Sequence, residues 1–452
     1  MKRKDGKYGV VTAITMIVGV CIGSGIFFKS DNILIATGGI VPLGVLVFAL
    51  GAISIIFGGL CLSQLSSRTD RAGGVITYFE EFGSKRLACG FGWFQTFIYY
   101  PTLSAVVSWV IGIYLSILFA WESSLELQIL IGFVFATICF IYNTLSRRFG
   151  GAFQNVTTVI KLIPLISIAV LGLIFGNPLE GLRQVSSSQV LGATWITAVG
   201  PIAFSYDGWV VSTSIAHEID KSKKNLSLAL ILAPIFVLIV YVMYFVGVTS
   251  YIGADEVMAL GDEHVSYVAS KLLGEFGAKA ILVFVIISVM GTVNGLVLGF
   301  IRLPYSLSLR GSVLPFSKRL STINERFGVS VHSAIYAYII MVVWTIVHYL
   351  TTRFNLLPNS DISEISIAMS YLSYIILYYK VFKMYRSGEI KGFTMGVIVP
   401  IFATIGSLFI LSGGLQSAFF VYYSAFCIFV VLISFAYYNF KTRVGKGQHI
   451  SL

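Results

Sequence analysis

The sequence is built largely from apolar stretches that are each long enough to cross a lipid bilayer as a helix, which takes about 20 residues. Charged residues make up only 11% of the 452 residues, whereas a soluble domain usually carries about 25%. This composition excludes a soluble enzyme, a disordered chain and a nucleic-acid-binding protein. It predicts an all-α membrane protein with twelve transmembrane helices. The predicted spans are residues 9–28, 42–65, 89–119, 127–145, 152–175, 191–216, 226–251, 279–301, 331–350, 361–383, 393–413 and 416–439.

The placement of the basic residues predicts how these helices are oriented. With both termini in the cytoplasm, 25 of the 31 Lys and Arg residues lie on the cytoplasmic side and five, including Lys29, lie in outer loops. The remaining one, Lys161, lies inside a span. This bias is the usual orientation signal of membrane proteins, so the net charge of +11 requires no anionic partner. We therefore expect a multi-pass protein of the plasma (inner) membrane.

Two spans contain residues that interrupt helices. Residues 19–27 of the first span include three glycines, and residues 200–209 of the sixth include two glycines and a proline. These spans are the first helices of two predicted five-helix repeats, which cover residues 1–175 and 176–385. Residues 386–452 would then hold two peripheral helices and a cytoplasmic tail. Interrupted helices at matching positions of two halves are typical of the binding site of a secondary transporter.

The interruptions suggest which ligand could bind. A half-helix that starts near Ser24 presents free N–H groups and a positive dipole end, which suit a carboxylate. Carbonyl oxygens at Cys21, Phe204 and Asp207 would suit an ammonium group. Together they would form a receptor for a zwitterion, made mostly of backbone. The alternative is that the small residues only allow close helix packing.

These residues also carry a resemblance to a known family. The chain resembles the amino acid–polyamine–organocation superfamily and, within it, the prokaryotic exchangers of the L-amino acid transporter family. The resemblance spans roughly residues 9–385. The matching stretches are residues 22–27, Gly73 and Gly74 followed by Tyr78 and Phe79, Gly92 and Trp93, residues 151–155 and 161–164, residues 204–209, and Glu218 with Asn225 and Leu226.

The resemblance implies a fold of the LeuT type, with two inverted five-helix repeats in which helices 1 and 6 are broken. It also implies sodium-independent exchange of L-amino acids by alternating access. The amides of Ser24 and Gly25 would bind the substrate carboxylate, and Phe204 would be the aromatic lid. The residues that we predict to contact the substrate are Cys21, Ser24, Gly25, Phe204, Ser205, Asp207 and Trp209.

Lys161 lies near the middle of the fifth span, where a cation is costly unless it faces a polar interior. In one interpretation, its ammonium replaces a sodium ion and bridges the first helix near Gly23 and the eighth near Ser288. In a second, Lys161 is a proton carrier, since buried lysines shift their pKa readily, and the protein is a proton-coupled amino acid symporter. In a third, Lys161 is purely structural.

Other residues allow two interpretations each. The Asp207 side chain either recruits the substrate ammonium or caps the restarted half-helix, or it is a solvated carboxylate. The Tyr244 hydroxyl either bonds to the site or belongs to a ring packed in the core. Trp209 is predicted to be a pocket wall rather than a residue of the membrane interface. Glu218 is predicted to form a cytoplasmic gate with Arg68 or Arg71, and the alternative is a surface carboxylate.

The sequence predicts few partners beyond the substrate and the lipid bilayer. The histidines and the five cysteines lack metal-ligand spacing, so we expect no metal, no cofactor and no disulfide framework. In eukaryotic relatives, the loop between spans three and four forms a disulfide with a heavy chain, but residues 120–126 here lack cysteine. We therefore expect a monomer or weak homodimer without a heavy chain. We expect small neutral substrates such as alanine, serine, threonine or cysteine, and no enzymatic activity.

Overall fold

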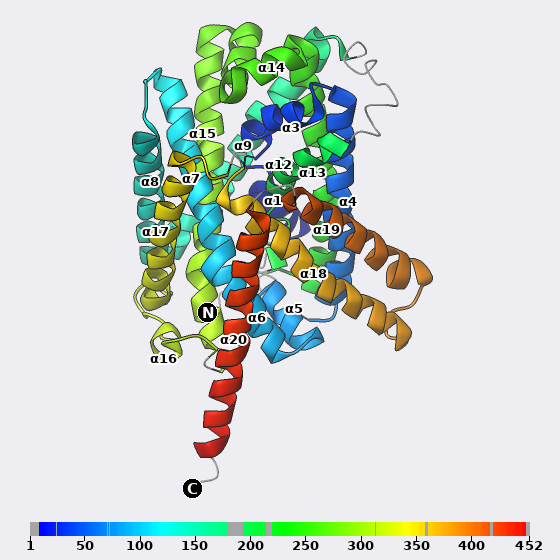
Figure 1. Cartoon of the computed structure of the whole chain (residues 1–452), viewed down its shortest axis with the longest axis vertical. Coiled ribbons are helices and arrows are strands. Elements are labelled where there is room, and N and C mark those ends of the chain that lie inside the picture. Colours follow the sequence, from blue (N-terminus) through cyan, green and yellow to red (C-terminus); the bar gives the residue numbers. More distant parts are fainter. Residues whose placement is uncertain are drawn as a thin grey trace, which may run out of the picture.

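The structure is a computed structural model, which describes residues 9–23, 25–69, 71, 73–178, 193–210, 212–213, 219–311, 313–357, 360–415 and 419–448. The described residues form a bundle of long helices (Figure 1). The end that carries α3 (Ser30–Thr37) and α14 (Ala254–Leu260) is termed the upper end, as in Figure 1. The end that carries α5 (Val75–Phe82) and α16 (Ser317–Leu320) is termed the lower end.

The part of the bundle up to residue 178 begins with three short helices and continues with longer ones. Besides α3 and α5 it contains α1 (Val10–Cys21), α2 (Gly25–Phe28), α4 (Val41–Ser66), α6 (Lys85–Phe94), the π-helical turn η1 (Gln95–Tyr99), α7 (Tyr100–Phe119), α8 (Leu125–Leu145) and α9 (Arg147–Phe175).

The rest of the chain adds a second set of helices. Besides α14 and α16 it contains η2 (Ala193–Ala198), α12 (Val199–Tyr206), α13 (Ser222–Ile252), η4 (Gly261–Glu263), α15 (His264–Ser308), α17 (Val331–Arg353), α18 (Ile362–Arg386), the π-helical turn η5 (Thr394–Ile398), α19 (Val399–Gly414) and α20 (Phe420–Gln448). α15 is interrupted at Gly274, whose φ of 70° lies in a region that favours glycine.

The described helices match most of the predicted spans. Among the described residues, ten helices are long and apolar enough to cross a membrane, and the bent pair Ala13–Phe27 and Ser30–Thr37, whose two parts meet at 58°, makes eleven. The sixth predicted span falls on η2, α12 and residues that the structure does not fully describe. An all-helical membrane fold is therefore confirmed, whereas the number twelve and the repeat boundaries stay predictions.

Polar side chains fix where several of these helices begin. Ser124, Ser146 and Ser330 each accept a hydrogen bond from the amide three residues further on, at the starts of α8, α9 and α17. Asp361 does the same for α18, accepting from the amide of Ser363 at 2.8 Å. Each cap satisfies an amide that would otherwise have no partner in the helix.

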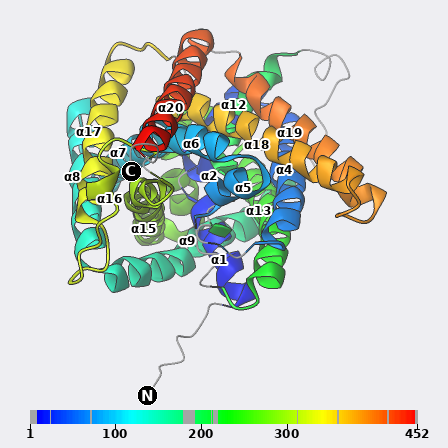
Figure 2. The same cartoon turned by 90° about the horizontal axis from the view of Figure 1, so that it is seen from below.

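The helices pack so that α1 touches α9, α13 and α15. α4 packs along α13 and also along α19. Figure 2 shows α8 and α17 along one edge of the bundle and α19 along the opposite edge. α20 lies at the periphery, packs on α6 and α18, and its C-terminal part extends beyond the lower end (Figure 1).

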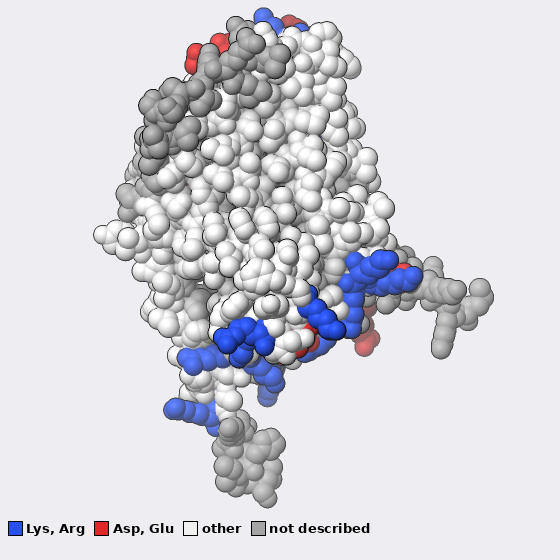
Figure 3. Space-filling model, turned by 90° about the vertical axis from the view of Figure 1, so that its right-hand side faces the viewer, with Lys and Arg blue, Asp and Glu red and all other residues white. Residues whose placement is uncertain are grey.

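The surface has the character of a membrane protein. Many large apolar side chains are exposed, including Ile138, Val159, Ile239 and Ile339. The face in Figure 3 has a broad band with few charges, and Lys and Arg gather toward its lower end. Apolar surface on this scale requires a lipid environment.

Candidate functional site

The first helix is interrupted inside the bundle. α1 ends at Cys21, and the next residue, Ile22, has a non-helical ψ of 87°. The amide of Gly23 bonds to the Cys21 carbonyl oxygen at 2.9 Å, which forms a tight turn. Helical structure resumes at Gly25, the first residue of α2. Ser24 lies outside the described residues, so its contact with a substrate carboxylate stays a prediction.

A second interruption follows α12. This helix ends at Tyr206, and Asp207 is extended, with φ −66° and ψ 157°. Gly208 then has a φ of 90°, which favours glycine. A Cβ on Gly208 would also lie only 2.5 Å from a methyl carbon of Val20, the penultimate residue of α1. Glycine is thus required at 208 both for the turn and for its close approach to α1.

The two interruptions lie against each other. A Cβ placed on Gly25 would lie 2.7 Å from the Cα of Ser205 and 3.2 Å from the ring of Phe204. No real Cβ approaches backbone so closely, so this arrangement accepts only glycine at 25. Four predicted substrate-contact positions, Gly25, Phe204, Ser205 and Cys21, therefore belong to one compact region.

A tyrosine of α13 joins the two interrupted segments. The hydroxyl of Tyr241 lies 2.7 Å from the carbonyl oxygen of Cys21 and 2.8 Å from that of Ser205. A hydroxyl has one proton to donate, so the two carbonyls share it. Tyr241 is fully buried, and this single group therefore links the end of α1 to α12.

For Tyr244, three residues further along α13, the sequence allows either a hydrogen bond to the site or a ring packed in the core. Its hydroxyl is buried without a hydrogen-bond partner among the described residues. Its ring packs edge-on against Phe27 with the centroids 5.4 Å apart. The structure thus favours the packing alternative for Tyr244.

Lys161 of α9 is fully buried and reaches toward α1 and α15. Its ammonium donates to the carbonyl oxygen of Gly19 and, at 3.4 Å, to the hydroxyl of Thr292. These are the two helices that we expected it to bridge. Each contact, however, lies one helical turn from the predicted position, Gly23 or Ser288. Thr292 also faces Gly23, since a Cβ there would lie 2.7 Å from its hydroxyl oxygen.

The carboxylate of Asp207 is engaged within the protein. It accepts a hydrogen bond from the hydroxyl of Tyr99, in the π-helical turn η1. It therefore differs from the solvated carboxylate considered above. Trp209 is almost fully buried and packs edge-on against Tyr374, with the ring centroids 5.7 Å apart. That is an interior position, not one at the membrane interface.

The carbonyl groups predicted to receive an ammonium are partly occupied already. The oxygen of Cys21 accepts from Tyr241, and that of Phe204 accepts from the amide of Asp207 at 3.3 Å. A carbonyl oxygen has two lone pairs. The Cys21 oxygen also accepts from the amide of Gly23, so a ligand ammonium can add a second bond at the Phe204 oxygen, whereas at Cys21 it would have to replace the Tyr241 bond.

The predicted gate at the lower end is only partly described. Arg68 donates to backbone carbonyl groups, including that of Glu389 at 3.1 Å. Arg71 is exposed and pairs with Glu81 at 3.0 Å. Glu218 lies outside the described residues, so its pairing with either arginine stays a prediction.

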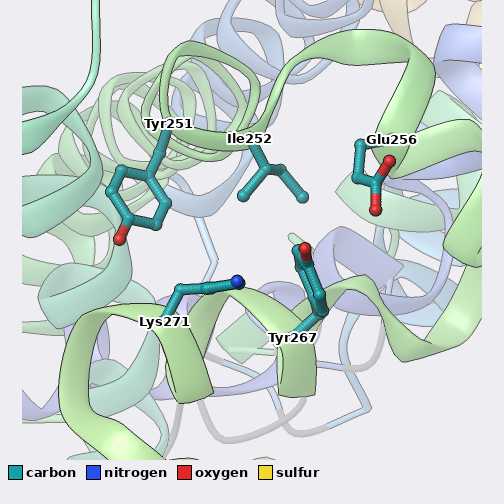
Figure 4. Close-up of a pocket in the computed structure, with 5 residues that line it drawn as sticks. All are labelled: Tyr251, Ile252, Glu256, Tyr267 and Lys271. Atoms are coloured by element: carbon teal, nitrogen blue, oxygen red, sulfur yellow. The ribbon is translucent and has the colours of Figure 1, made fainter.

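The described part of the site offers backbone and hydroxyl groups for hydrogen bonding. In the part of the chain that the structure describes, no group of three or more His, Cys, Asp or Glu residues could hold a metal ion. All five cysteines are buried as free thiols. A cavity of about 430 Å³ lies at the upper end, but it is lined by none of the predicted site residues (Figure 4). Its lining is Tyr251, Ile252, Glu256, Tyr267 and Lys271.

Three important residues were not singled out from the sequence. Tyr241 is hidden among the abundant aromatic residues, which make up 14% of the chain. Tyr99 lies in an otherwise unremarkable apolar span. Thr292 could have been found, because it lies on the same face of α15 as Ser288, one turn further on.

Comparison with known proteins gives consistent results. A family model described as amino acid permease matches residues 8–436. The serine/threonine exchanger SteT of Bacillus subtilis (strain 168) is 29% identical over 96% of this chain and 97% of its own length. The human b(0,+)-type amino acid transporter 1 is 26% identical over 98% and 90% of the two chains. The human cystine/glutamate transporter is 26% identical over 91% and 80%.

Proposed function

Since this chain belongs to the amino acid permease family, we propose that it is a secondary transporter that exchanges L-amino acids across the membrane without sodium. Family and relatives are transporters rather than enzymes, and the relatives named above carry amino acids. The predicted resemblance to the L-amino acid transporter exchangers is thereby confirmed.

One observation carries the proposal: the two interrupted segments meet at Gly25 and Ser205, and Tyr241 bonds to both. Interrupted helices in a membrane expose backbone groups that only a ligand or a neighbouring side chain can satisfy. A zwitterion offers a carboxylate to the start of α2 and an ammonium to the carbonyl groups near Cys21. The site therefore binds the carboxylate and the ammonium group that all α-amino acids share.

Sodium independence is supported by Lys161. Its buried ammonium joins α1 to α15 through Gly19 and Thr292. No ion pair of the described residues includes Lys161. A fixed positive charge at this junction does what a bound sodium ion would do, since it bridges oxygen atoms of two helices, and it repels a second cation.

Small neutral side chains suit the site best. Gly25 lies directly against Phe204 and Ser205, and the ring of Trp209 is buried against Gly58. These close contacts leave little room beside the backbone groups. The name of the serine/threonine exchanger among the relatives agrees with alanine, serine, threonine or cysteine as substrates.

The orientation follows from charge. We infer that the lower end, where Lys and Arg gather in Figure 3, faces the cytoplasm of a cell whose plasma membrane holds the protein. We also infer that a single chain suffices, as a monomer or a weak homodimer. The turn between α7 and α8 offers no thiol for a disulfide with a heavy chain.

Uptake by purified protein in liposomes tests the proposal. A panel of labelled L-amino acids is offered to empty vesicles and to vesicles loaded with unlabelled amino acid, in sodium and in choline buffer. We expect uptake only into loaded vesicles, equal in the two buffers and greatest for small neutral substrates. Uptake into empty vesicles driven by acid outside would instead identify a proton-coupled symporter.

A further inference from the structure

Lys29, at the junction of α2 and α3, is not the loop cation that the charge pattern suggested. It is 4% exposed. Its ammonium pairs with Asp361 at 3.0 Å and with Glu364 at 2.8 Å, and both carboxylates are also buried. A buried lysine held by two buried carboxylates is costly to break, because separation would leave charges without partners.

This cluster connects α18 to both interrupted segments. Lys29 lies only four residues after Gly25. Its ammonium also lies 5.2 Å from the ring centroid of Phe204, at the other interruption. Asp361 caps α18 through Ser363 while it binds Lys29. The cluster therefore covers Phe204 on the upper side and ties α18 to the start of the chain.

A polar cavity of about 230 Å³ opens beside this ion pair. Two opposite charges, Lys29 and Asp361, line it together. Other polar side chains on its wall are Asn32, Thr351, Thr352, Asn355 and Ser360. The cavity, the ion pair, Phe204 and Gly25 thus follow one another from the upper end toward the site.

We propose that this cavity is an outer vestibule site for the amino acid zwitterion, which rests on the function proposed above. The ligand carboxylate binds Lys29 and the ligand ammonium binds Asp361. Because the ligand carries one charge of each sign, Lys29 and Asp361 each exchange one opposite charge for another, while Glu364 gives up Lys29 and keeps the hydrogen bond from Ser360. Lys29 is thereby released from α18, and the path past Phe204 opens.

Glu364, the second carboxylate, makes this vestibule prefer neutral and basic substrates to acidic ones. Glu364 accepts a hydrogen bond from Ser360 at 2.8 Å and stays in place when Lys29 leaves. With two carboxylates and one lysine, the cluster has an excess of negative charge. An acidic substrate side chain is therefore repelled at the vestibule, whereas neutral and basic side chains are admitted.

Asp361→Asn tests the vestibule, because asparagine caps helices as well as aspartate does and Lys29 keeps Glu364 as a buried partner. Exchange is measured in intact cells, where substrate meets the upper end, and in inverted membrane vesicles, where it meets the lower end. Losing the charged partner should raise the KM for external alanine by about tenfold or more. The KM at the lower end should change by less than about twofold, since the vestibule lies on the other side of the site.

The matched control is Glu126→Gln. It removes an exposed ion pair at the same end, between Glu126 and Arg353 at 3.7 Å, and should alter neither KM. A shift of both KM values in Asp361→Asn, or of neither, would overturn the vestibule while leaving the exchanger intact. If wild-type protein shows no exchange at all, the proposed function itself fails.

Glu364→Gln provides an independent readout. It keeps the Lys29–Asp361 pair and removes the excess negative charge. We expect the external KM for alanine to stay within about threefold, while external glutamate becomes a better inhibitor by a similar or larger factor. Unchanged inhibition by glutamate would contradict the charge preference assigned to the vestibule.

Discussion

The Tyr241 hydroxyl lies 2.7 Å from the carbonyl oxygen of Cys21, the last residue of α1. Through the same hydroxyl, α13 also holds the Ser205 carbonyl of α12. One buried phenol therefore fixes the distance between the two interrupted segments. If the substrate binds between these segments, Tyr241 controls the geometry of the site without belonging to either interruption.

Tyr241→Phe should impair exchange while the protein still folds. The change removes a hydrogen bond worth about 1 kcal/mol and takes the side-chain link between the Cys21 and Ser205 carbonyl groups away. We expect substrate affinity to fall by about fivefold, measured as binding to purified protein. Tyr244→Phe is the matched control, because its hydroxyl has no partner among the described residues. Equal losses in the two variants would show that the Tyr241 bonds are not important for the site.

Lys161→Met should reduce exchange more than tenfold. The Gly19 carbonyl and the Thr292 hydroxyl lose a buried charged partner, and the loss of its hydrogen bonds costs about 2 kcal/mol or more of interaction free energy. The variant should remain monodisperse in detergent. Thr292→Val should have a smaller effect of the same kind. Ser288→Ala should be close to neutral, since the Ser288 hydroxyl is buried without a partner among the described residues. Normal exchange by Lys161→Met would leave Lys161 with a structural role only.

Lys161 illustrates which features of the site the sequence can predict. A lysine inside an apolar span must find oxygen atoms, so its burial and its role as a bridge between helices could be predicted. Its exact partners could not, because they depend on how α1 and α15 are rotated about their own axes. That rotation is set by packing across the whole bundle, and an error of one turn moved the expected contacts from Gly19 and Thr292 to Gly23 and Ser288.

Lys29 shows the opposite case. Next to a predicted helix end, a lysine resembles an ordinary loop cation, and its partners lie more than 330 residues further along the chain. No local sequence pattern predicts such a contact. Helices, by contrast, depend on local composition, which is why eleven of the predicted spans coincide with helices of the structure.

Gly25→Ala should abolish substrate binding. The added Cβ would lie 2.7 Å from the Ser205 backbone, so the two interrupted segments must separate, at a cost of about 1–3 kcal/mol. Gly151→Ala is the control, since a Cβ there meets nothing within 4 Å. In the helix α9 it should raise stability by about 0.5–1 kcal/mol. Both are measured by thermal unfolding with and without substrate; a substrate-induced stabilisation that survives in Gly25→Ala would contradict the assigned site.

Full activity should be obtained from the purified chain alone. The five cysteines are buried as free thiols, so no surface thiol is available for a covalent partner. Exchange rates of the reconstituted protein should be the same with and without reducing agent. Activity that appears only when a second polypeptide is added would contradict the single-chain assignment.

The most direct test of the exchanger is efflux from preloaded liposomes. Vesicles containing purified protein and labelled serine are diluted into sodium-free buffer, first without and then with unlabelled serine outside. We predict that label stays inside until external serine is added and then leaves rapidly, to the same extent at pH 6 and pH 8. Efflux that begins without external amino acid, or that follows the pH gradient, would contradict obligatory exchange.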